Sequence, residues 1–417
     1  MNHSMTPLIT NDAIVLGILI SILAVIFKTS KSIRPFWKKF YTAVPSLLLC
    51  YFIPSLFNSA GIISGDQSSL YFVVSRYFLP SSLVLLTISI DLKAILNLGP
   101  KAVGMFLVGT FGIIIGGPVS IVIISIFSPE IVGGSGDNAV WRGLTTVAGD
   151  WIGGGANQTA MKEVFQVNDF LFSAVTTIEI IVANIWLGFL LYGAANYEKI
   201  DKWLKADHSA IDEVRLKIES FQKKHARVAD LSELTTICAI GFGATAIAHF
   251  GAGIISPWIF ENAPALAKYN LTSDFFWIVI ISTTIGLALS FTRARNLEGA
   301  GASRVGTLFL YMLVATIGMK MDVLAIFSNP GLILVCALWI VIHAGLLILV
   351  AKLIKAPFFF IAVGSQANIG GAASAPIVAS AFHPALAPVG VLLAVLGYAL
   401  GTYGAWLCGL AMQAVAP

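Results

Sequence analysis

The sequence has very few charged residues for its length. Only 11% of its 417 residues are Asp, Glu, Lys or Arg, whereas a soluble domain contains about a quarter. Hydrophobic residues make up 57% of the chain, and the mean hydropathy is +0.88. This composition excludes an ordinary soluble domain and indicates an integral membrane protein, which we expect to be all-α.

Cysteine is also scarce, and the common catalytic motifs are absent. The four cysteines stand singly in apolar stretches, which favours buried small hydrophobic residues over a metal site or disulfides. No Walker motif and no H-E-x-x-H occur, so an ATP-driven pump is excluded. A net charge of +4, with the basic residues in short connectors, gives no sign of nucleic-acid binding. We expect no enzyme, no catalytic residues and no organic cofactor.

Long apolar runs fill most of the chain. A bilayer core requires about 20 apolar residues per helix. The candidate spans are 12–27, 41–57, 70–90, 102–127, 140–165, 169–194, 232–255, 274–291, 303–320, 331–354, 357–382 and 386–412. The first is expected to be a retained helix with its amino end outside, because its basic cluster follows the apolar run.

A polar segment divides the chain into two similar halves. We predict a first transmembrane repeat over 1–194, a polar linker over 195–230 and a second repeat over 231–417. "SIDLKAIL" (89–96) resembles "KMDVLAIF" (320–327), and "WIGGGA" (151–156) resembles "NIGGAA" (368–373). Repeats of this size are typical of transporter folds. Asp91 and Asp322 are expected to begin short interfacial turns.

The predicted spans do not give a consistent topology. The basic loop 28–40 and the linker 195–230 should both be cytoplasmic, yet the predicted spans place an odd number of crossings between them. Six spans per half also imply parallel repeats, whereas inverted repeats need an odd number. Either one segment is re-entrant or the linker lies outside.

Each half contains a helix interrupted by glycines and flanked by polar residues. The first is "AGDWIGGGANQTA" (148–160) and the second is "VGSQANIGGAASAP" (363–376). Each glycine costs about 1 kcal/mol in a helix interior, and irregular backbone survives in lipid only where it is buried or lines a wet cavity. We predict two crossing helices broken near mid-membrane and facing each other; close helix packing by small residues is the alternative.

The breaks supply the candidate site. Half-helix amino ends suit an anionic group, and freed carbonyls suit a cation. Residues expected to bind substrate are Gly153, Gly154, Gly155, Gln158, Gly370, Gly371 and Ser374. Oxygen ligands for a hard cation such as Na⁺ are expected among Asn157, Thr159, Gln366 and Asn368.

Two acids are further candidates. Glu179 lies deep within a predicted span, where ionisable groups are by default functional. It is expected to bind Na⁺ or exchange a proton, with a structural acid held by a salt bridge or by hydrogen bonds as the alternative. Asp150 is either a second ion ligand or the cap of the second half-helix.

Other polar residues in apolar runs are ambiguous. Arg76 is expected to pair with Glu179 or Asp150, to recognise a substrate carboxylate, or to extend to the surface. His249 and His343 are expected to make structural hydrogen bonds.

These motifs resemble a known family. "GDWIGGGANQTAMKEVF", the charged linker and "SQANIGGAASAPIVA" are similar to the YjcL-like family of bacterial membrane proteins over nearly the whole chain. That family is grouped with the cation:proton antiporter and anion transporter superfamily, whose members include sodium–bile acid and glutamate:sodium symporters. The resemblance implies a core domain with two crossing broken helices, a scaffold domain, elevator-like movement and a homodimer in the bacterial inner membrane.

In the bile-acid branch, sodium is held by polar residues around the crossover and by a glutamate. The resemblance implies those roles for Asn157, Thr159, Gln366 and Asn368, with Glu179 as the acid. Bile-acid symporters carry their glutamate in a broken helix, whereas Glu179 lies in the next span. The Asp or Asn–Asp pair of antiporters is not found here, which favours Na⁺-coupled uptake.

We therefore predict a secondary transporter that couples Na⁺ or H⁺ to movement of a small organic anion, amino acid or short peptide. A Na⁺/H⁺ antiporter using Glu179 or Asp150 is the alternative. An intramembrane hydrolase using Ser135 or Asp150 is a remote one, since "GGSG" (133–136) and "AGD" (148–150) match only parts of protease motifs.

Overall fold

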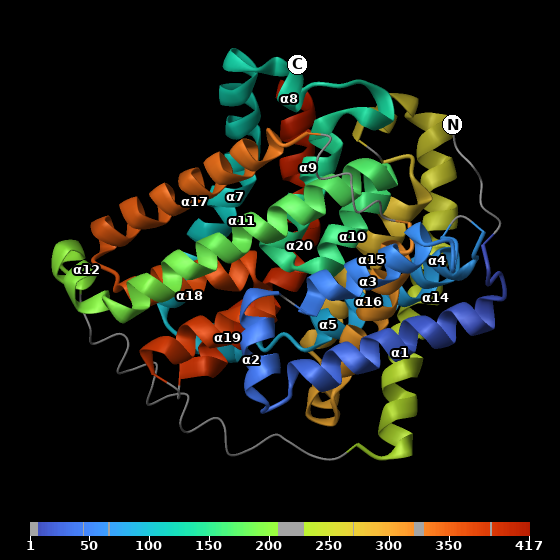
Figure 1. Cartoon of the computed structure of the whole chain (residues 1–417), viewed down its shortest axis with the longest axis horizontal. Coiled ribbons are helices and arrows are strands. Elements are labelled where there is room, and N and C mark those ends of the chain that lie inside the picture. Colours follow the sequence, from blue (N-terminus) through green and yellow to red (C-terminus); the bar gives the residue numbers. More distant parts are fainter. Residues whose placement is uncertain are drawn as a thin grey trace.

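The structure is a computed structural model that describes residues 7–44, 46–65, 67–206, 229–269, 271–320, 329–383 and 386–417, and every regular element in these ranges is helical (Figure 1). Seven stretches are long and apolar enough to cross a membrane, and an eighth is α15 (Asp274–Ser290) with η4 (Arg293–Ala300), bent by 94°. The seven are α1 (Asp12–Ser30), Leu70–Ile88, α7 (Pro100–Phe127), α11 (Asp169–Ala195), α14 (Leu231–Asn262), α17 (Leu332–Ile354) and the Val389–Val415 part of α20 (Ala387–Val415). The protein is therefore an all-α, multi-pass membrane protein.

Side-chain caps define where the long helices begin. The Asn11 side chain accepts a hydrogen bond from the Ala13 N–H at 2.9 Å before α1. The Asn168 side chain accepts one from the Leu171 N–H at 2.8 Å before α11. Because the first N–H groups of a helix have no intrahelical partner, these caps stabilise the chosen start sites.

The first glycine break reverses the chain. It separates α9 (Val140–Gly153) from α10 (Gly155–Val164). Arg142, near the start of α9, donates a hydrogen bond from Nη1 to the Phe165 carbonyl at 2.5 Å. In a straight helix these residues would lie about 35 Å apart. Helices α9 and α10 therefore form a hairpin, called here hairpin 1.

The second glycine break also reverses the direction of the chain. It separates α18 (Phe358–Ile369) from α19 (Gly371–Phe382), and the Phe359 and Phe382 rings lie 5.2 Å apart at the far ends of the two helices. Figure 1 shows α18 and α19 side by side at the lower left. We call this pair hairpin 2.

The prediction of two crossing helices is therefore wrong. The breaks are where the sequence placed them, but the segments 140–165 and 357–382 each return towards the side on which they began. Gly154 has a φ of +74° and Gly371 a φ of +57°, conformations that glycine adopts without steric cost. These two residues allow the reversal.

The helices pack as two groups, with many contacts inside each group and few between them. The hairpin group contains α7, α9–α11 and α17–α20. The flanking group contains α1, α3 (Ser46–Ser59), α4 (Leu70–Val73), the π-helical turn η1 (Val74–Phe78), α5 (Leu79–Ile88) and α14, α15 and α16 (Ala302–Gly318). The flanking group lies on the right of Figure 1.

Within the hairpin group, α20 approaches hairpin 1 very closely. A Cβ atom at Gly397 would lie 2.5 Å from the carbonyl oxygen of Ile152 in α9. Only glycine permits this distance, and it brings the end of α9 against α20.

One of the two predicted Asp turns is described. Asp91 directly precedes α6 (Leu92–Asn97), and one of its carboxylate oxygens lies 3.3 Å from Nη1 of Arg295 in η4. Asp91 thus begins a turn as predicted. Asp322 and residues 207–228 of the linker lie outside the described residues.

Candidate functional site

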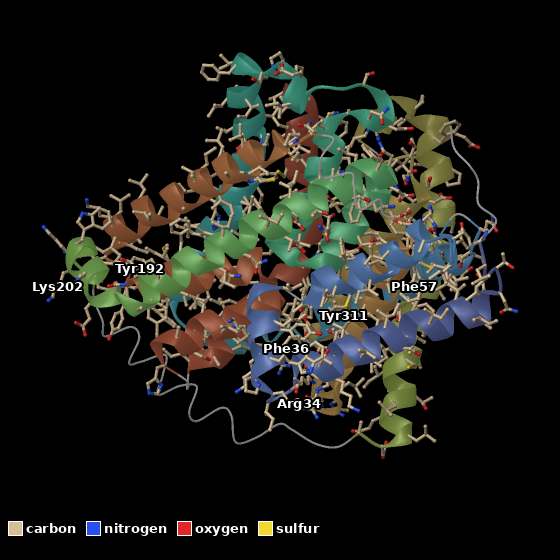
Figure 2. All side chains as sticks on the ribbon, in the orientation of Figure 1. Arg34, Phe36, Phe57, Tyr192, Lys202 and Tyr311 are labelled. Atoms are coloured by element: carbon tan, nitrogen blue, oxygen red, sulfur yellow. The ribbon has the colours of Figure 1, made fainter. Side chains whose placement is uncertain are left out.

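A cavity of about 430 Å³ lies where the two hairpin tips meet the flanking group. The hairpin group contributes Asp150, Gly154, Gly155, Ala156, Ile180, Ala183, Asn184, Leu187, Gln366, Ile369, Gly370, Gly371, Ser374 and Tyr398. The flanking group contributes Ser46, Leu86, Thr307, Leu310 and Tyr311. Tyr311 is labelled near the middle of the molecule in Figure 2. The structure thus brings both predicted breaks to one site.

The tips present the amino ends of two helices to this cavity. Helix α10 begins at Gly155 and α19 at Gly371, and both residues line the cavity. The first N–H groups of a helix are unpaired within it and carry a partial positive charge. Of the glycines predicted to bind substrate, Gly154, Gly155, Gly370 and Gly371 line the cavity, whereas Gly153 packs behind the tip against α20.

Asp150 is the one charged residue among the described residues that line the cavity. It lies in the last turn of α9, and its backbone carbonyl accepts a hydrogen bond from the Gly154 N–H at 2.8 Å. Within the described ranges its carboxylate has no ion pair with Lys, Arg or His. Asp150 ends the first half-helix rather than capping the second, so the capping alternative is wrong.

Glu179 lies on α11 and is 1% exposed. Its Oε1 accepts a hydrogen bond from Nε2 of Gln158 at 2.6 Å, while its buried Oε2 has no hydrogen-bond partner. The Oε1 of Gln158 accepts one from the Tyr51 hydroxyl at 3.2 Å. Glu179 is also close enough to Asp150 for the two carboxylates to interact electrostatically. Of the two structural alternatives for Glu179, the salt bridge is not found in the described part of the chain, whereas a hydrogen bond is present.

Gln366 joins the two arms of hairpin 2 at the tip. Its Nε2 donates to the Ser374 Oγ at 2.6 Å. Its Oε1 is buried and has no hydrogen-bond partner, although the residue lines the cavity. Ser374 and Gln366 therefore lie where the sequence prediction placed them, and Gln366 offers a free acceptor.

Asn157 lies behind the tip of hairpin 1. Its Nδ2 donates to the carbonyls of Gly153 at 3.2 Å and Tyr398 at 3.1 Å, and its Oδ1 accepts from the Thr402 hydroxyl at 2.6 Å. The amide thus ties hairpin 1 to α20. Thr159, two residues further on, donates its hydroxyl to the Gly155 carbonyl at 2.7 Å.

Asn368 has a similar position in hairpin 2. Its Nδ2 donates to the carbonyls of Phe106 at 3.0 Å and Gly364 at 2.9 Å, and its Oδ1 accepts from the Thr110 hydroxyl at 2.8 Å. This amide ties hairpin 2 to α7. A Na⁺ ion bound at either asparagine oxygen would share it with the hydroxyl, through the second lone pair of the amide oxygen.

The sequence reasoning missed an ionic cluster at the open end of hairpin 1. The hairpin ionic cluster consists of Tyr71, Arg76, Lys162, Glu163, Asp169 and Lys320. Nζ of Lys162, which is 5% exposed, lies 2.8 Å from Oδ1 of Asp169 and 3.0 Å from the Tyr71 hydroxyl. The adjacent residues Lys162 and Glu163 in an apolar region are the sequence signal from which this cluster could have been predicted.

Arg76 belongs to that cluster and not to the cavity. Its Nη2 lies 3.6 Å from a Glu163 carboxylate oxygen, and its guanidinium lies 4.4 Å from the centre of the Phe275 ring. The predicted pairing with Glu179 or Asp150 is therefore wrong.

Both isolated histidines make the predicted structural hydrogen bonds. Nδ1 of His343 lies 2.9 Å from the Gly109 carbonyl, which can only accept, so Nδ1 carries the proton. Its Nε2 lies 2.8 Å from the Ser365 hydroxyl, which must then donate to it. His249 Nε2 lies 2.9 Å from the Arg76 carbonyl.

The residues of the hydrolase alternative lie in different surroundings. Ser135 is exposed in the loop before η2 (Gly136–Asn138), whereas Asp150 lines the cavity. Within the described ranges, no group of three or more His, Cys, Asp or Glu side chains is placed to hold a metal ion.

Comparison with known proteins identifies the family. The "Uncharacterized membrane protein YjcL" of Bacillus subtilis (strain 168) is 23% identical over 378 residues, which cover 88% of this chain and 89% of that protein. The model of the family described as "Protein of unknown function (DUF819)" matches residues 17–415. The predicted resemblance to YjcL-like membrane proteins is confirmed, and the chain belongs to the DUF819 family.

Proposed function

We propose that this protein is a secondary active transporter that moves a small polar solute across a bacterial inner membrane. The observation that carries the proposal is the cavity lined by both hairpin tips, by the carboxylate of Asp150 and by the flanking helices. Intramembrane cavities formed where helices are interrupted are typical solute sites of transporters.

The hairpins give a consistent topology. If hairpin 1 is re-entrant, and if the 14-residue helix α3 crosses in addition to the Leu70–Ile88 stretch, α7 and α11, the chain crosses four times between the basic loop 28–40 and residue 195. The loop and the linker then share the cytoplasmic side, as their charge requires. Counting α1, the first half then crosses five times, an odd number, as inverted repeats require. Hairpin 1 then opens outside and hairpin 2 inside.

The packing of the helices supports an elevator-type movement. The hairpin group would be the moving core and the flanking group the scaffold, because contacts between them are sparse and the cavity lies on their boundary. Displacement of the core relative to the scaffold would expose the cavity first to one side and then to the other.

Glu179 is the proposed site of the coupling cation. A buried carboxylate without a basic partner is costly in a membrane, and binding Na⁺ or H⁺ relieves that cost. Its unpartnered Oε2 and its bond to Gln158 leave one oxygen available for this cation. For Na⁺, further ligands are proposed among Asn157, Thr159 and Asn368, whereas Asp150 and Gln366, which were also predicted as ion ligands, line the cavity and are proposed to contact the solute.

The remaining assignments follow from this proposal. We place the family in the cation:proton antiporter and anion transporter superfamily, as a homodimer without an enzymatic role, organic cofactor or nucleic-acid partner. A Na⁺/H⁺ antiporter is the second candidate, favoured by the proximity of Asp150 and Glu179.

The test is thermal unfolding of the purified protein in Na⁺, K⁺, Li⁺ and choline at two pH values. A cation that binds only the folded state raises the midpoint by mass action. A Na⁺-specific rise that Glu179→Gln abolishes, and that Glu130→Gln in the short helix α8 (Pro129–Val132), where Glu130 is exposed, preserves, supports Na⁺ coupling. A pH-dependent midpoint lost only in Glu179→Gln supports H⁺ coupling.

Transport is measured on the same variants in proteoliposomes. Gradient-driven solute uptake supports the symporter, and pH-dependent Na⁺ flux without solute supports the antiporter. If no cation shifts the midpoint and no gradient drives solute or ion flux, the proposed function is wrong.

A further inference from the structure

We propose that the cavity binds a small zwitterion with an aliphatic side chain, such as an aliphatic amino acid or short peptide, and that Asp150 recognises its ammonium group. This inference rests on the proposed function and specifies its substrate class. It also separates the roles of the two acids: Asp150 contacts the solute, and Glu179 holds the coupling cation.

The charges in the lining exclude a simple organic anion. Among the lining residues that the structure describes, Asp150 is the one charged side chain, and none is Lys, Arg or His. An anionic solute would place a second negative charge beside Asp150 without a compensating cation, which is unfavourable in a site of low dielectric constant. A solute that carries its own positive charge removes this conflict.

Three hydrogen-bond acceptors match the three N–H donors of an ammonium group. Asp150 supplies its carboxylate, and Gln366 supplies a buried Oε1 that has no partner in the protein. Asn184 donates its Nδ2 to the Ile180 carbonyl at 2.7 Å, which leaves its Oδ1 as the third acceptor.

Donors for a carboxylate lie in the same lining. The first turns of α10 and α19 present unpaired N–H groups with partial positive charge. Ser374 accepts a hydrogen bond from Gln366, so its own O–H is available to donate. The lining thus contains both acceptors for an ammonium group and donors for a carboxylate, as a molecule with both charges requires.

The rest of the lining is aliphatic. Its apolar residues include Leu86, Ile180, Leu187, Leu310 and Ile369. A volume of about 430 Å³ lies within the range of small-molecule sites, about 300–1,000 Å³. An aliphatic side chain would bury its surface against these residues, which provides selectivity for that class of solute.

Burial supports the division between the two acids. Glu179 is 1% exposed and does not line the cavity, whereas Asp150 does. Because the two carboxylates interact, a cation on Glu179 reduces the negative potential at Asp150 and an ammonium group at Asp150 reduces it at Glu179. Each ligand thereby changes the affinity for the other by the same factor, and this reciprocity is the basis of coupling.

The experiment compares three matched pools of probes: alanine, valine, leucine and isoleucine; their N-acetyl derivatives, which lack the ammonium group; and their amides, which lack the carboxylate. Unfolding midpoints in detergent and gradient-driven uptake in proteoliposomes are measured for each pool. We expect the amino-acid pool to raise the midpoint and to be transported. Loss of either charge should weaken binding by roughly 10- to 100-fold, the value of one charge-assisted hydrogen bond.

Variants of the protein test which residue binds the ammonium group. Asp150→Asn should abolish the response to amino acids, and Asp137→Asn in an exposed loop should leave it unchanged. If Asp150→Asn fails to fold, Gln366→Met tests the same acceptor set and should weaken amino-acid binding by about tenfold.

Three results would overturn this inference. They are equal or tighter binding of the N-acetyl pool, binding of the amides as tight as that of the amino acids, and an unchanged response in Asp150→Asn. Failure of all pools to bind overturns it as well. The proposed function fails separately, only if no solute or ion flux follows any gradient.

Discussion

The hairpin ionic cluster allows a quantitative test of the packing between the two helix groups. The carboxylate of Asp169 forms ion pairs with two ammonium groups, Lys162 Nζ at 2.8 Å and Lys320 Nζ at 3.1 Å. The Lys162 side chain is 5% exposed, whereas those of Asp169 and Lys320 are 32% and 21% exposed. Removing Asp169 therefore leaves a buried ammonium group with Tyr71 as its hydrogen-bond partner.

We expect Asp169→Asn to lower the free energy of unfolding by about 2–3 kcal/mol. Breaking a fully buried ion pair costs about 3–5 kcal/mol, and the solvent exposure of Asp169 reduces this cost. Lys162→Met should cost about 1–2 kcal/mol, because Asp169 keeps Lys320 and water. Lys320→Met, at a partly exposed pair, should cost at most about 1 kcal/mol.

The assay is equilibrium unfolding in mixed micelles, followed by helical circular dichroism. The double variant Lys162→Met/Asp169→Asn should lose less than the sum of the single losses, with a coupling of about 1–2 kcal/mol. Additive losses, or a larger loss in Lys320→Met than in Asp169→Asn, would show that Lys162 is not held by this carboxylate.

Three further substitutions test the fold. Gly397→Ala should lower stability by about 1–3 kcal/mol, because its Cβ would lie 2.5 Å from the Ile152 carbonyl oxygen; Gly17→Ala, with no atom within 4 Å, is the control, and equal midpoints would contradict the close contact. His343→Phe should cost about 1–3 kcal/mol, since it removes two buried hydrogen bonds while Ser365 keeps the one it accepts from Trp186, and an unchanged midpoint would argue against these hydrogen bonds. Arg142→Gln should cost about 1–2 kcal/mol by removing the bond across the open end of hairpin 1; protection from hydrogen exchange in α10 should fall, and unchanged exchange would oppose the hairpin geometry.

Several features could be predicted from local sequence. The scarcity of charge indicated membrane helices, because charged groups are costly in a bilayer. The predicted span 169–194 matches α11, since an asparagine cap directly precedes a long apolar run. The two glycine breaks were also predicted, because consecutive glycines weaken a helix wherever they occur.

The direction of the chain after each break was not predictable. A glycine at positive φ permits both a kink and a reversal, and the choice depends on which helices are present to receive the returning arm. Here α20 and α7 provide that support, through the hydrogen bonds that Asn157 and Asn368 make to them. Both partners lie more than two hundred residues away in the chain, so no local pattern contains this information.

The candidate site also combines features that the local sequence decides with features that only the packing of distant helices decides. The sequence by itself determined an all-helical membrane protein, two polar glycine breaks and an acid buried in a span, because composition and local propensity decide those features. Only the tertiary structure decided that the breaks are hairpin tips, that Asp150 lines the cavity while Glu179 lies behind it, and that Arg76 belongs to an ionic cluster instead. These outcomes depend on contacts between helices that are distant in sequence, and the energy of such contacts exists only once the helices have packed.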